Sequence, residues 1–337
     1  MRKEALLYQK LDGQQVQCNL CCHRCKIANE KFGFCGVRQN IDAVLFTHVY
    51  GNIISYHVDP IEKKPLYHFL PGSKSFSIAT IGCNFRCGFC QNWEISQVRV
   101  DENIAKEENY HSPETVIKAA LDNGCKSIAY TYTEPTIFFE YALDCAQLAK
   151  EKGLHNIFVT NGFMTKEAMQ MIMPYLNAAN IDLKFFKEGS YNKICNGSLQ
   201  PVLDSIALMN KLGIWVEVTT LVVPGENDSE QELRAIAQFL ASVDKNIPWH
   251  ISRFHPDYKL QNTALTPEKT LKKVFDIGYQ AGLRYVYIGN VFAWGNDTIC
   301  YKCKKLLIKR EGFNILDNHL QNNSCSYCKV IIPGVFN

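Results

Sequence analysis

The sequence lacks several features that would assign it to a particular environment. No stretch approaches the roughly 18 apolar residues of a membrane-spanning helix, and residues 1–17 are polar and charged, without the apolar core of a secretory signal. A net charge of only +3 gives little attraction for polyanions. No low-complexity linker or solenoid repeat interrupts the 337 residues, of which 47% are hydrophobic. We therefore expect no membrane span, no nucleic-acid partner, and one large domain with appendages.

Cysteine, in contrast, is abundant. The 15 cysteines could indicate a secreted disulfide protein, but the chain is long, the count is odd and no signal segment is expected. Most of the cysteines stand in closely spaced sets, which suit metals better than disulfides. We expect a cytoplasmic protein from a reducing compartment that is sensitive to oxygen.

Cysteine content divides the chain into three expected domains. Residues 1–74 form an N-terminal cysteine-rich region whose sequence predicts irregular, turn-rich structure. Residues 75–299 form the core, in which Cys125, Cys145 and Cys195 are scattered and are expected to be ordinary buried residues. Residues 300–337 form a tail with four cysteines and six Lys/Arg against two Asp/Glu.

The core alternates apolar strand patterns with helical patterns. The expected strands are Ser75–Ile81, Lys126–Tyr132, His155–Thr160, Ala178–Lys184, Ile214–Val222, Trp249–Phe254 and Arg284–Ile288. The expected helices are Pro113–Asp122, Ile137–Lys152, Lys166–Tyr175, Leu199–Lys211, Ser229–Val243 and Pro267–Ala281, with Ser112 and Thr266 as N-caps and glycines 124, 153, 213 and 282 after the C-termini. This order predicts an α/β fold with a parallel sheet curled into a partial or complete barrel, whose chemistry gathers at the C-terminal strand ends.

Directly after the first core strand, Cys83, Cys87 and Cys90 form a CxxxCxxC run. Three thiolates on a four-iron cluster leave one iron open, and an open iron can bind and cleave a ligand. Cys18, Cys22 and Cys25 repeat the spacing, but no long apolar strand precedes them and Cys21 and Cys35 crowd the set. We therefore assign catalysis to the 83–90 run.

Polar side chains follow the other expected strands. Asp182 and Lys184 share one strand face, as a binding site or as a structural ion pair. Glu134 stands where it could cap the next helix. Val222 could wall an adenine ring or belong to the core. His255 could donate to a bound carboxylate or be structural.

The 83–90 run resembles that of the radical S-adenosylmethionine (SAM) enzymes. In those proteins an aromatic residue, here Phe89, usually lies beside the adenine, and a Gly-Gly-Glu-Pro segment, here Tyr132-Thr133-Glu134-Pro135, holds the amino group of the methionine moiety. The resemblance implies a [4Fe-4S] cluster, SAM, an electron donor (a ferredoxin or flavodoxin) and a 5′-deoxyadenosyl radical that abstracts hydrogen from a substrate.

Further stretches resemble the glycyl-radical-enzyme activases, such as pyruvate formate-lyase activating enzyme. They are Thr160-Asn161-Gly162-Phe163, Asp182-Leu183-Lys184, Val222-Val223-Pro224-Gly225 and Phe254-His255. The resemblance implies that Lys184 and His255 bind the methionine carboxylate. It also implies a monovalent cation between paired aspartates, of which Asp182 matches one, while Val159 stands at the other and cannot ligate.

Residues 59–72, 90–97 and 130–136 are similar to the radical SAM protein of the AmmeMemoRadiSam system, a similarity that covers nearly the whole chain. On composition alone, residues 59–72 would be a turn-rich loop. The resemblance implies a partial (β/α) barrel of radical SAM type, an N-terminal cysteine-rich region, a C-terminal zinc-ribbon-like tail and companion proteins of that system.

Two cysteine sets lie outside the core. The pairs Cys300/Cys303 and Cys325/Cys328 predict a structural zinc site, with a rubredoxin-like iron as the alternative. Cys18, Cys21, Cys25 and Cys35 predict a second metal site, either zinc or an auxiliary iron–sulfur cluster. Cys22 is an alternative ligand there, and we do not expect His23 to ligate.

Three functions follow from these patterns. The first is a radical SAM enzyme of the AmmeMemoRadiSam type with an unidentified protein or small-molecule substrate. The second is a glycyl-radical activase in the strict sense. The third is a zinc-binding scaffold without catalysis, of which nucleic-acid binding through the basic tail is a weaker variant.

Overall fold

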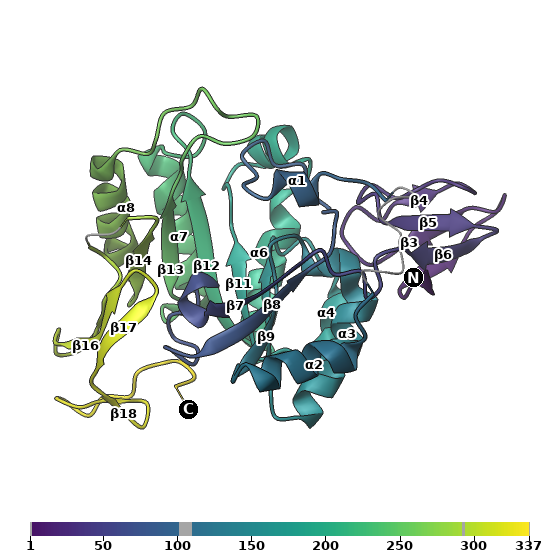
Figure 1. Cartoon of the computed structure of the whole chain (residues 1–337). Helices are drawn as coiled ribbons and strands as arrows, with labels where there is room; N and C mark the ends of the chain where they lie inside the picture. The colour runs from purple at the N-terminus through teal and green to yellow at the C-terminus, as the bar shows by residue number, and fades with distance from the viewer. Residues whose placement is uncertain (1, 101–109, 292–293, 337) are drawn as a thin grey trace.

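A computed structural model describes residues 2–100, 110–291 and 294–336, so that residues 101–109 and 292–293 of the expected core lie outside the described residues. Its centre is an eight-stranded sheet with the order β14-β13-β12-β11-β10-β9-β8-β7 (Figure 1). The strands are β7 Ser55–Pro60, β8 Lys74–Ala79, β9 Ser127–Tyr130, β10 His155–Thr160, β11 Ala178–Asp182, β12 Trp215–Val222, β13 Trp249–Arg253 and β14 Val286–Gly289.

Strands β8 to β14 pair in parallel in the order in which they occur along the chain. Their residues are mostly buried, as both faces of a parallel sheet require. Because each strand is followed by a helix that returns the chain to the start of the next strand, all C-terminal strand ends meet at one edge. The prediction of a mostly parallel α/β sheet is confirmed.

The helices of the core are α2 Pro113–Asp122, α3 Phe139–Glu151, α4 Lys166–Ile172, α6 Leu199–Lys211, α7 Glu230–Asp244 and α8 Glu268–Gln280. Ser112 caps α2 as predicted, because its hydroxyl accepts from the Thr115 N–H. The predicted cap at Thr266 is wrong: its hydroxyl accepts from Phe254 N–H and donates to the Val222 carbonyl, which fastens α8 to the ends of β12 and β13. The four glycines predicted after helices all have positive φ.

The N-terminal region is more regular than its sequence predicts. It contains one sheet of β1 Lys3–Glu4, β6 Val44–Thr47 and β5 Arg38–Ile41, and another of β2 Tyr8–Lys10, β3 Val16–Cys18 and β4 Lys26–Ile27. These strands are very short, so that turn residues dominate the sequence. Strand β7, from the same region, pairs antiparallel with β8 and forms an edge of the central sheet.

The C-terminal tail forms small sheets of β15 Thr298–Ile299, β16 Leu306–Glu311 and β17 Asn314–Asn318, and of β18 Leu320–Gln321 and β19 Ser324–Cys325. It packs on the core through Tyr67, Tyr285 and Tyr287. The tail and the N-terminal strands lie at opposite ends of the molecule (Figure 1).

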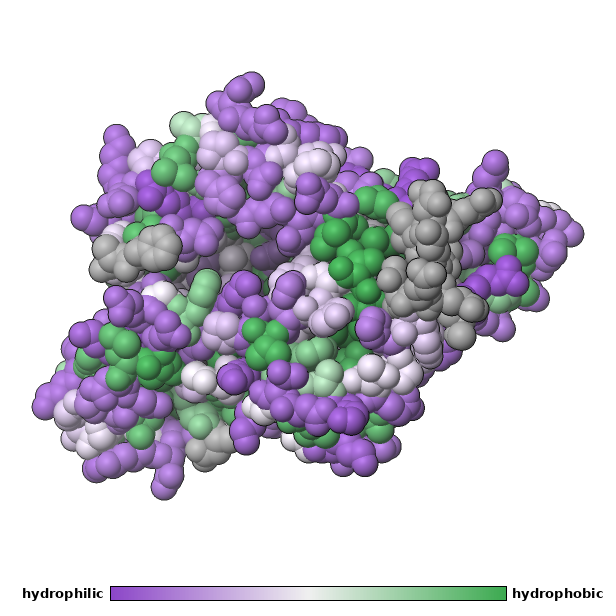
Figure 2. All heavy atoms as spheres, in the orientation of Figure 1, coloured by the Kyte–Doolittle hydropathy of each residue, from purple (hydrophilic) through white to green (hydrophobic). Residues whose placement is uncertain are grey.

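Hydrophilic residues dominate the face shown in Figure 2, with hydrophobic residues confined to patches. Within the described residues, no helix combines the length and the hydropathy that crossing a bilayer requires.

Candidate active site

The Cys83–Cys90 loop begins four residues after the last residue of β8, at the C-terminal edge of the sheet. Gly82, immediately before it, has φ +89°, and a Cβ there would lie 2.6 Å from a Val37 methyl and 3.1 Å from the Cys35 carbonyl oxygen. Only glycine tolerates this approach. The N-terminal region therefore presses directly against the start of the cysteine loop.

Each sulfur of the loop has a close polar or thiol neighbour. Cys83 Sγ accepts from Phe85 N–H at 3.3 Å, and Cys90 Sγ lies 3.1 Å from Ser96 Oγ in the short helix α1 (Trp93–Ser96). Cys87 Sγ lies 3.4 Å from Cys195 Sγ, at the end of the π-helix η4 (Tyr191–Cys195). Cys195 is buried as expected, but no sequence pattern indicates that it lies beside the predicted ligands.

The thiols are poorly suited to remain ionised without a metal. Burial raises the pKa of Cys83 well above its ordinary value, and the Cys195 thiol together with burial does the same for Cys87. Thiolate is nevertheless the form that binds a metal. Metal binding must therefore release protons, and the site gains its charge only when it is loaded.

Glu134 is buried and its carboxylate is fully engaged inside the protein. One oxygen accepts from the Thr136 N–H at 3.1 Å, the Thr136 hydroxyl at 2.6 Å and the Thr160 hydroxyl at 2.7 Å; the other accepts from Asn161 N–H at 2.8 Å. The alternative that it caps the next helix is confirmed, at η3 (Pro135–Phe138). Burial raises the pKa of Glu134 although these donors oppose the shift.

Asn161, after β10, connects this carboxylate to the cysteine loop. Its side-chain amide donates to Asn84 Oδ1 at 2.7 Å and lies 3.9 Å from Cys83 Sγ. Thr160 and Asn161 thus join the ends of two neighbouring strands and fix the backbone around the first cysteine of the loop.

Lys184, two residues beyond β11, forms an ion pair of 2.8 Å with Asp182, the last residue of that strand; the side chains are 14% and 34% exposed. The Lys184 ammonium lies 5.8 Å from the centre of the Phe89 ring. Burial opposes its charge, but Asp182 and the nearby thiols Cys87 and Cys195 raise the pKa of Lys184 well above its ordinary value. The structure therefore places a retained cation beside the cysteine loop.

Two further predicted residues lie at the ends of β12 and β13. Gln91, in the segment after Cys90, donates its amide to His255 Nε2 at 2.7 Å. His255 is exposed. Val222 is fully buried in the main hydrophobic core.

Sequence reasoning gave no role to the side chain of Tyr132. This residue has φ +64°, which is uncommon for a residue other than glycine. The Asp59 carboxylate accepts a hydrogen bond from the Tyr132 hydroxyl and so fixes this residue. The same carboxylate accepts from Ser77 Oγ at 2.9 Å and from the Nζ atoms of Lys63 and Lys64 at 2.9 and 2.6 Å. Although the composition of residues 59–72 suggests a loop, Asp59 is therefore fixed by hydrogen bonds and stabilises the backbone around Tyr132.

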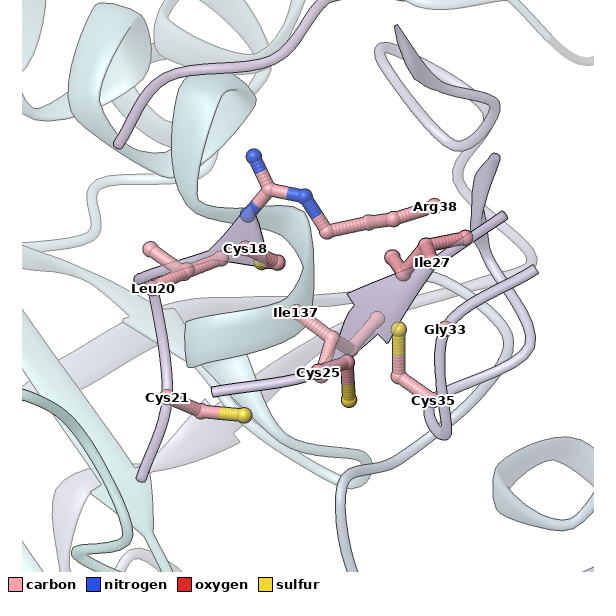
Figure 3. Close-up of a pocket in the computed structure, with 9 residues that line it drawn as sticks. All are labelled: Cys18, Leu20, Cys21, Cys25, Ile27, Gly33, Cys35, Arg38 and Ile137. Carbon is pink, nitrogen blue, oxygen red and sulfur yellow. The ribbon is translucent and has the colours of Figure 1, made fainter. Parts of the chain in front are cut away.

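The two outer cysteine sets differ in geometry. The ligand atoms of Cys300, Cys303, Cys325 and Cys328 lie within 4.8 Å of one another, so they could hold one metal ion. Cys18, Cys21, Cys25 and Cys35 line one pocket (Figure 3).

Two neighbours of the N-terminal set are directed elsewhere. Cys22 donates its thiol to the Met164 carbonyl at 3.2 Å, and His23 Nε2 lies 2.7 Å from the Asn84 carbonyl oxygen. The pocket is lined by neither residue.

Comparison with known proteins places this geometry in context. Residues 77–240 match the model of the radical SAM superfamily. The uncharacterized protein MJ0808 of Methanocaldococcus jannaschii is 43% identical over 97% of each chain. The putative glycyl-radical enzyme activating enzyme MJ1632 of the same organism is 27% identical over 70% of this chain and 87% of its own. The crystal structure of a radical SAM methyltransferase from Sphaerobacter thermophilus shares the fold, with a TM-score of 0.52 over 71% of each chain at 12% identity.

Proposed function

Because this chain belongs to the radical SAM superfamily, we propose that Cys83, Cys87 and Cys90 hold a [4Fe-4S] cluster whose fourth iron binds SAM. The observation that supports this most strongly is the convergence of three cysteines, the Phe89 ring and the Lys184 ammonium at one strand edge. When bound and reduced, cluster and SAM together supply methionine and a 5′-deoxyadenosyl radical. Membership of this superfamily supports an enzyme and disfavours a zinc scaffold without catalysis.

In this proposal the surrounding residues orient the nucleotide. Lys184 binds the methionine carboxylate as a point charge, and His255 donates to the same group. The main chain of residues 132–135 accepts from the amino group, with Glu134, Thr160 and Asn161 fixing the backbone there. Phe89 flanks the adenine, and Asp182 keeps Lys184 charged and in place.

We further propose an enzyme of the AmmeMemoRadiSam type in the cytoplasm, with a ferredoxin or flavodoxin as electron donor and companion proteins of that system. The open order of the sheet is compatible with a partial barrel of the radical SAM type. The converging sulfurs of the tail favour a structural zinc ion in a zinc-ribbon-like domain.

A second candidate function is activation of a glycyl-radical enzyme, favoured by the 27% identity to the putative glycyl-radical enzyme activating enzyme MJ1632. An activase needs a partner that presents a glycine loop. Mixing the reduced enzyme, SAM and a candidate partner would then yield a glycyl radical signal in electron paramagnetic resonance (EPR), whereas the first function gives none with any such partner.

Product analysis tests the proposed function. The anaerobically reconstituted protein, reduced in the presence of SAM, should release methionine and 5′-deoxyadenosine in equal amounts. The Cys83→Ala variant should release neither, while Cys125→Ala, which removes a buried thiol elsewhere in the core, should behave as the parent. Equal release by parent and Cys83→Ala would overturn the proposal.

A further inference from the structure

We propose that Cys18, Cys21, Cys25 and Cys35 hold a second iron–sulfur cluster rather than a zinc ion. The four side chains surround one pocket, together with the apolar side chains of Leu20, Ile27 and Ile137 (Figure 3). They come from strand β3 with the turn after it and from the loop before β5, so that two segments converge on one space. Four thiols around a common pocket form a ligand set for a cluster with four protein ligands.

The spacing of the sulfurs distinguishes a cluster from a single ion. Two thiolates on one zinc ion lie at most about 4.6 Å apart, because each Zn–S bond is about 2.3 Å long. The described residues contain one group of three or more His, Cys, Asp or Glu whose ligand atoms all lie within 4.8 Å, and it is the C-terminal set. The N-terminal sulfurs are spread more widely, as a cluster with several iron atoms requires.

The catalytic loop provides an internal comparison, which rests on the proposed function. Cys83, Cys87 and Cys90 also fall outside that compact group, although they are the ligands we assign to a [4Fe-4S] cluster. The chain thus holds two sets of cysteines around wide sites and one set around a narrow site. This difference assigns iron–sulfur chemistry to the first two sets and zinc to the third.

Arg38 supplies an independent indication that a ligand belongs in the pocket. Its side chain is 2% exposed, lines the pocket, and pairs with the Glu140 carboxylate and the Leu6 carbonyl through Nη2 alone. Its Nε and Nη1 atoms are buried and have no hydrogen-bond partner. Buried donors of this kind are costly unless they are satisfied. Cluster and thiolate sulfurs are acceptors that carry the negative charge that a guanidinium complements.

The second cluster would lie beside the first. The Cys35 carbonyl oxygen closely approaches Gly82, the residue before Cys83, and His23 contacts the carbonyl of Asn84, the residue after it. Arg86, inside the catalytic loop, donates to the Phe34 carbonyl. Each ligand loop therefore touches the other within one or two residues of a cysteine.

The test uses the full chain without its catalytic ligands, so that failure of the proposed function is distinguishable from failure of this inference. The Cys83→Ala/Cys87→Ala/Cys90→Ala variant is reconstituted anaerobically with iron and sulfide, and is examined by metal analysis and Mössbauer spectroscopy. We expect retained iron and inorganic sulfide in equal amounts, with a cluster spectrum. Adding Cys25→Ala and Cys35→Ala together, which leaves two of the four thiols, should abolish this iron, whereas adding Cys22→Ala, in the same loop but with its thiol directed at Met164, should retain it.

Zinc bound at the C-terminal set reports folding in every variant. An iron-free triple variant with zinc at both outer sets, or iron that survives the combined Cys25→Ala and Cys35→Ala changes, would overturn the inference.

Discussion

The Tyr132 hydroxyl donates a hydrogen bond to the Asp59 carboxylate, across 73 residues of sequence. Tyr132 occupies the left-handed backbone region, at a position where radical SAM sequences often have glycine. Such a conformation costs roughly 1–3 kcal/mol and persists only where surrounding contacts determine it. Asp59, on the edge strand β7, provides those contacts and so supports the segment that we assign to the amino group of SAM.

Asp59→Asn should destabilise the fold severely. The carboxylate is 5% exposed and neutralises Lys64, which is 1% exposed, so the variant leaves a buried cation without a partner. We expect a loss of about 3–5 kcal/mol in the free energy of unfolding, measured by urea denaturation. Lys63→Met is the matched control: its ammonium contacts the same carboxylate from a side chain that is 45% exposed, and the loss should stay below about 1 kcal/mol. Equal losses would contradict this view of Asp59.

Lys184→Met should weaken SAM binding without removing iron. A hydrogen bond to a charged group contributes about 1.5–3 kcal/mol, which corresponds to a rise in Kd of about 10- to 100-fold. The measurement is equilibrium binding of SAM to the reconstituted protein. Lys193→Met, an exposed lysine in the π-helix η4, should leave Kd unchanged. An unaltered Kd in Lys184→Met would show that the Asp182–Lys184 pair is structural only.

Cys195→Ala should shift the potential of the catalytic cluster to a more negative value. Cys195 Sγ accepts from the Cys87 thiol at 3.4 Å. Once Cys87 is a thiolate ligand it can only accept, so the Cys195 thiol becomes the donor, and a hydrogen bond to a cluster sulfur stabilises the reduced, more negative state. If this hydrogen bond contributes about 0.5–1.5 kcal/mol, its loss lowers the one-electron reduction potential by about 20–65 mV. An EPR-monitored redox titration measures it, with Cys125→Ala as the control. Loss of the cluster instead would mean that Cys195 is itself a ligand.

His68 should make the unfolding free energy depend on pH. The ring is fully buried, with Nδ1 2.8 Å from the Pro333 carbonyl oxygen and Nε2 2.7 Å from the Tyr287 hydroxyl, so it joins the tail to the core. Burial lowers the pKa of His68 to about 4, with further effects of its charged neighbours Glu217, Arg310 and His250. Between that value and the ordinary pKa near 6.5, the unfolded chain binds more protons than the folded one.

The stabilising contribution is therefore complete above about pH 6.5 and is lost as the pH falls toward about 4. Between about pH 7 and about pH 5 the loss should reach about 2 kcal/mol, measured by urea denaturation. The His68→Gln variant removes this titration and should show a correspondingly weaker dependence. If the unfolding free energies of parent and variant depend on pH in the same way, His68 is not the source of the dependence.

Cap residues and helix-ending glycines in the sequence predicted the helices whose ends they set. Helix α2 has the predicted bounds because Ser112 and Pro113 start it and Gly124 follows it, and α6 matches as well. The parallel order of the sheet followed from the alternation of strand and helix patterns. The edge strand β7 was not predicted, because half of its residues face solvent and its pairing with β8 is set by tertiary contacts.

The candidate site shows the same contrast between what local patterns predict and what tertiary contacts determine. The rule that strand ends meet at one edge was enough to bring Lys184 and Asn161 toward the cysteine loop. The partners Cys195 and Asp59 could not be found this way, because they lie 108 and 73 residues from the groups they contact and carry no local pattern. The Thr266 hydroxyl was misassigned since a nearby carbonyl from β12 competes with the helix terminus for it.

The central claim is that three cysteines leave one iron open to the amino and carboxylate groups of SAM. Electron–nuclear double resonance on the reduced protein, with SAM labelled by ¹⁵N at the amino group and ¹⁷O at the carboxylate, tests it most directly. We predict hyperfine couplings from both labels to the cluster in the parent, and none in the Cys83→Ala variant. A reduced cluster that binds SAM but shows neither coupling would contradict the account.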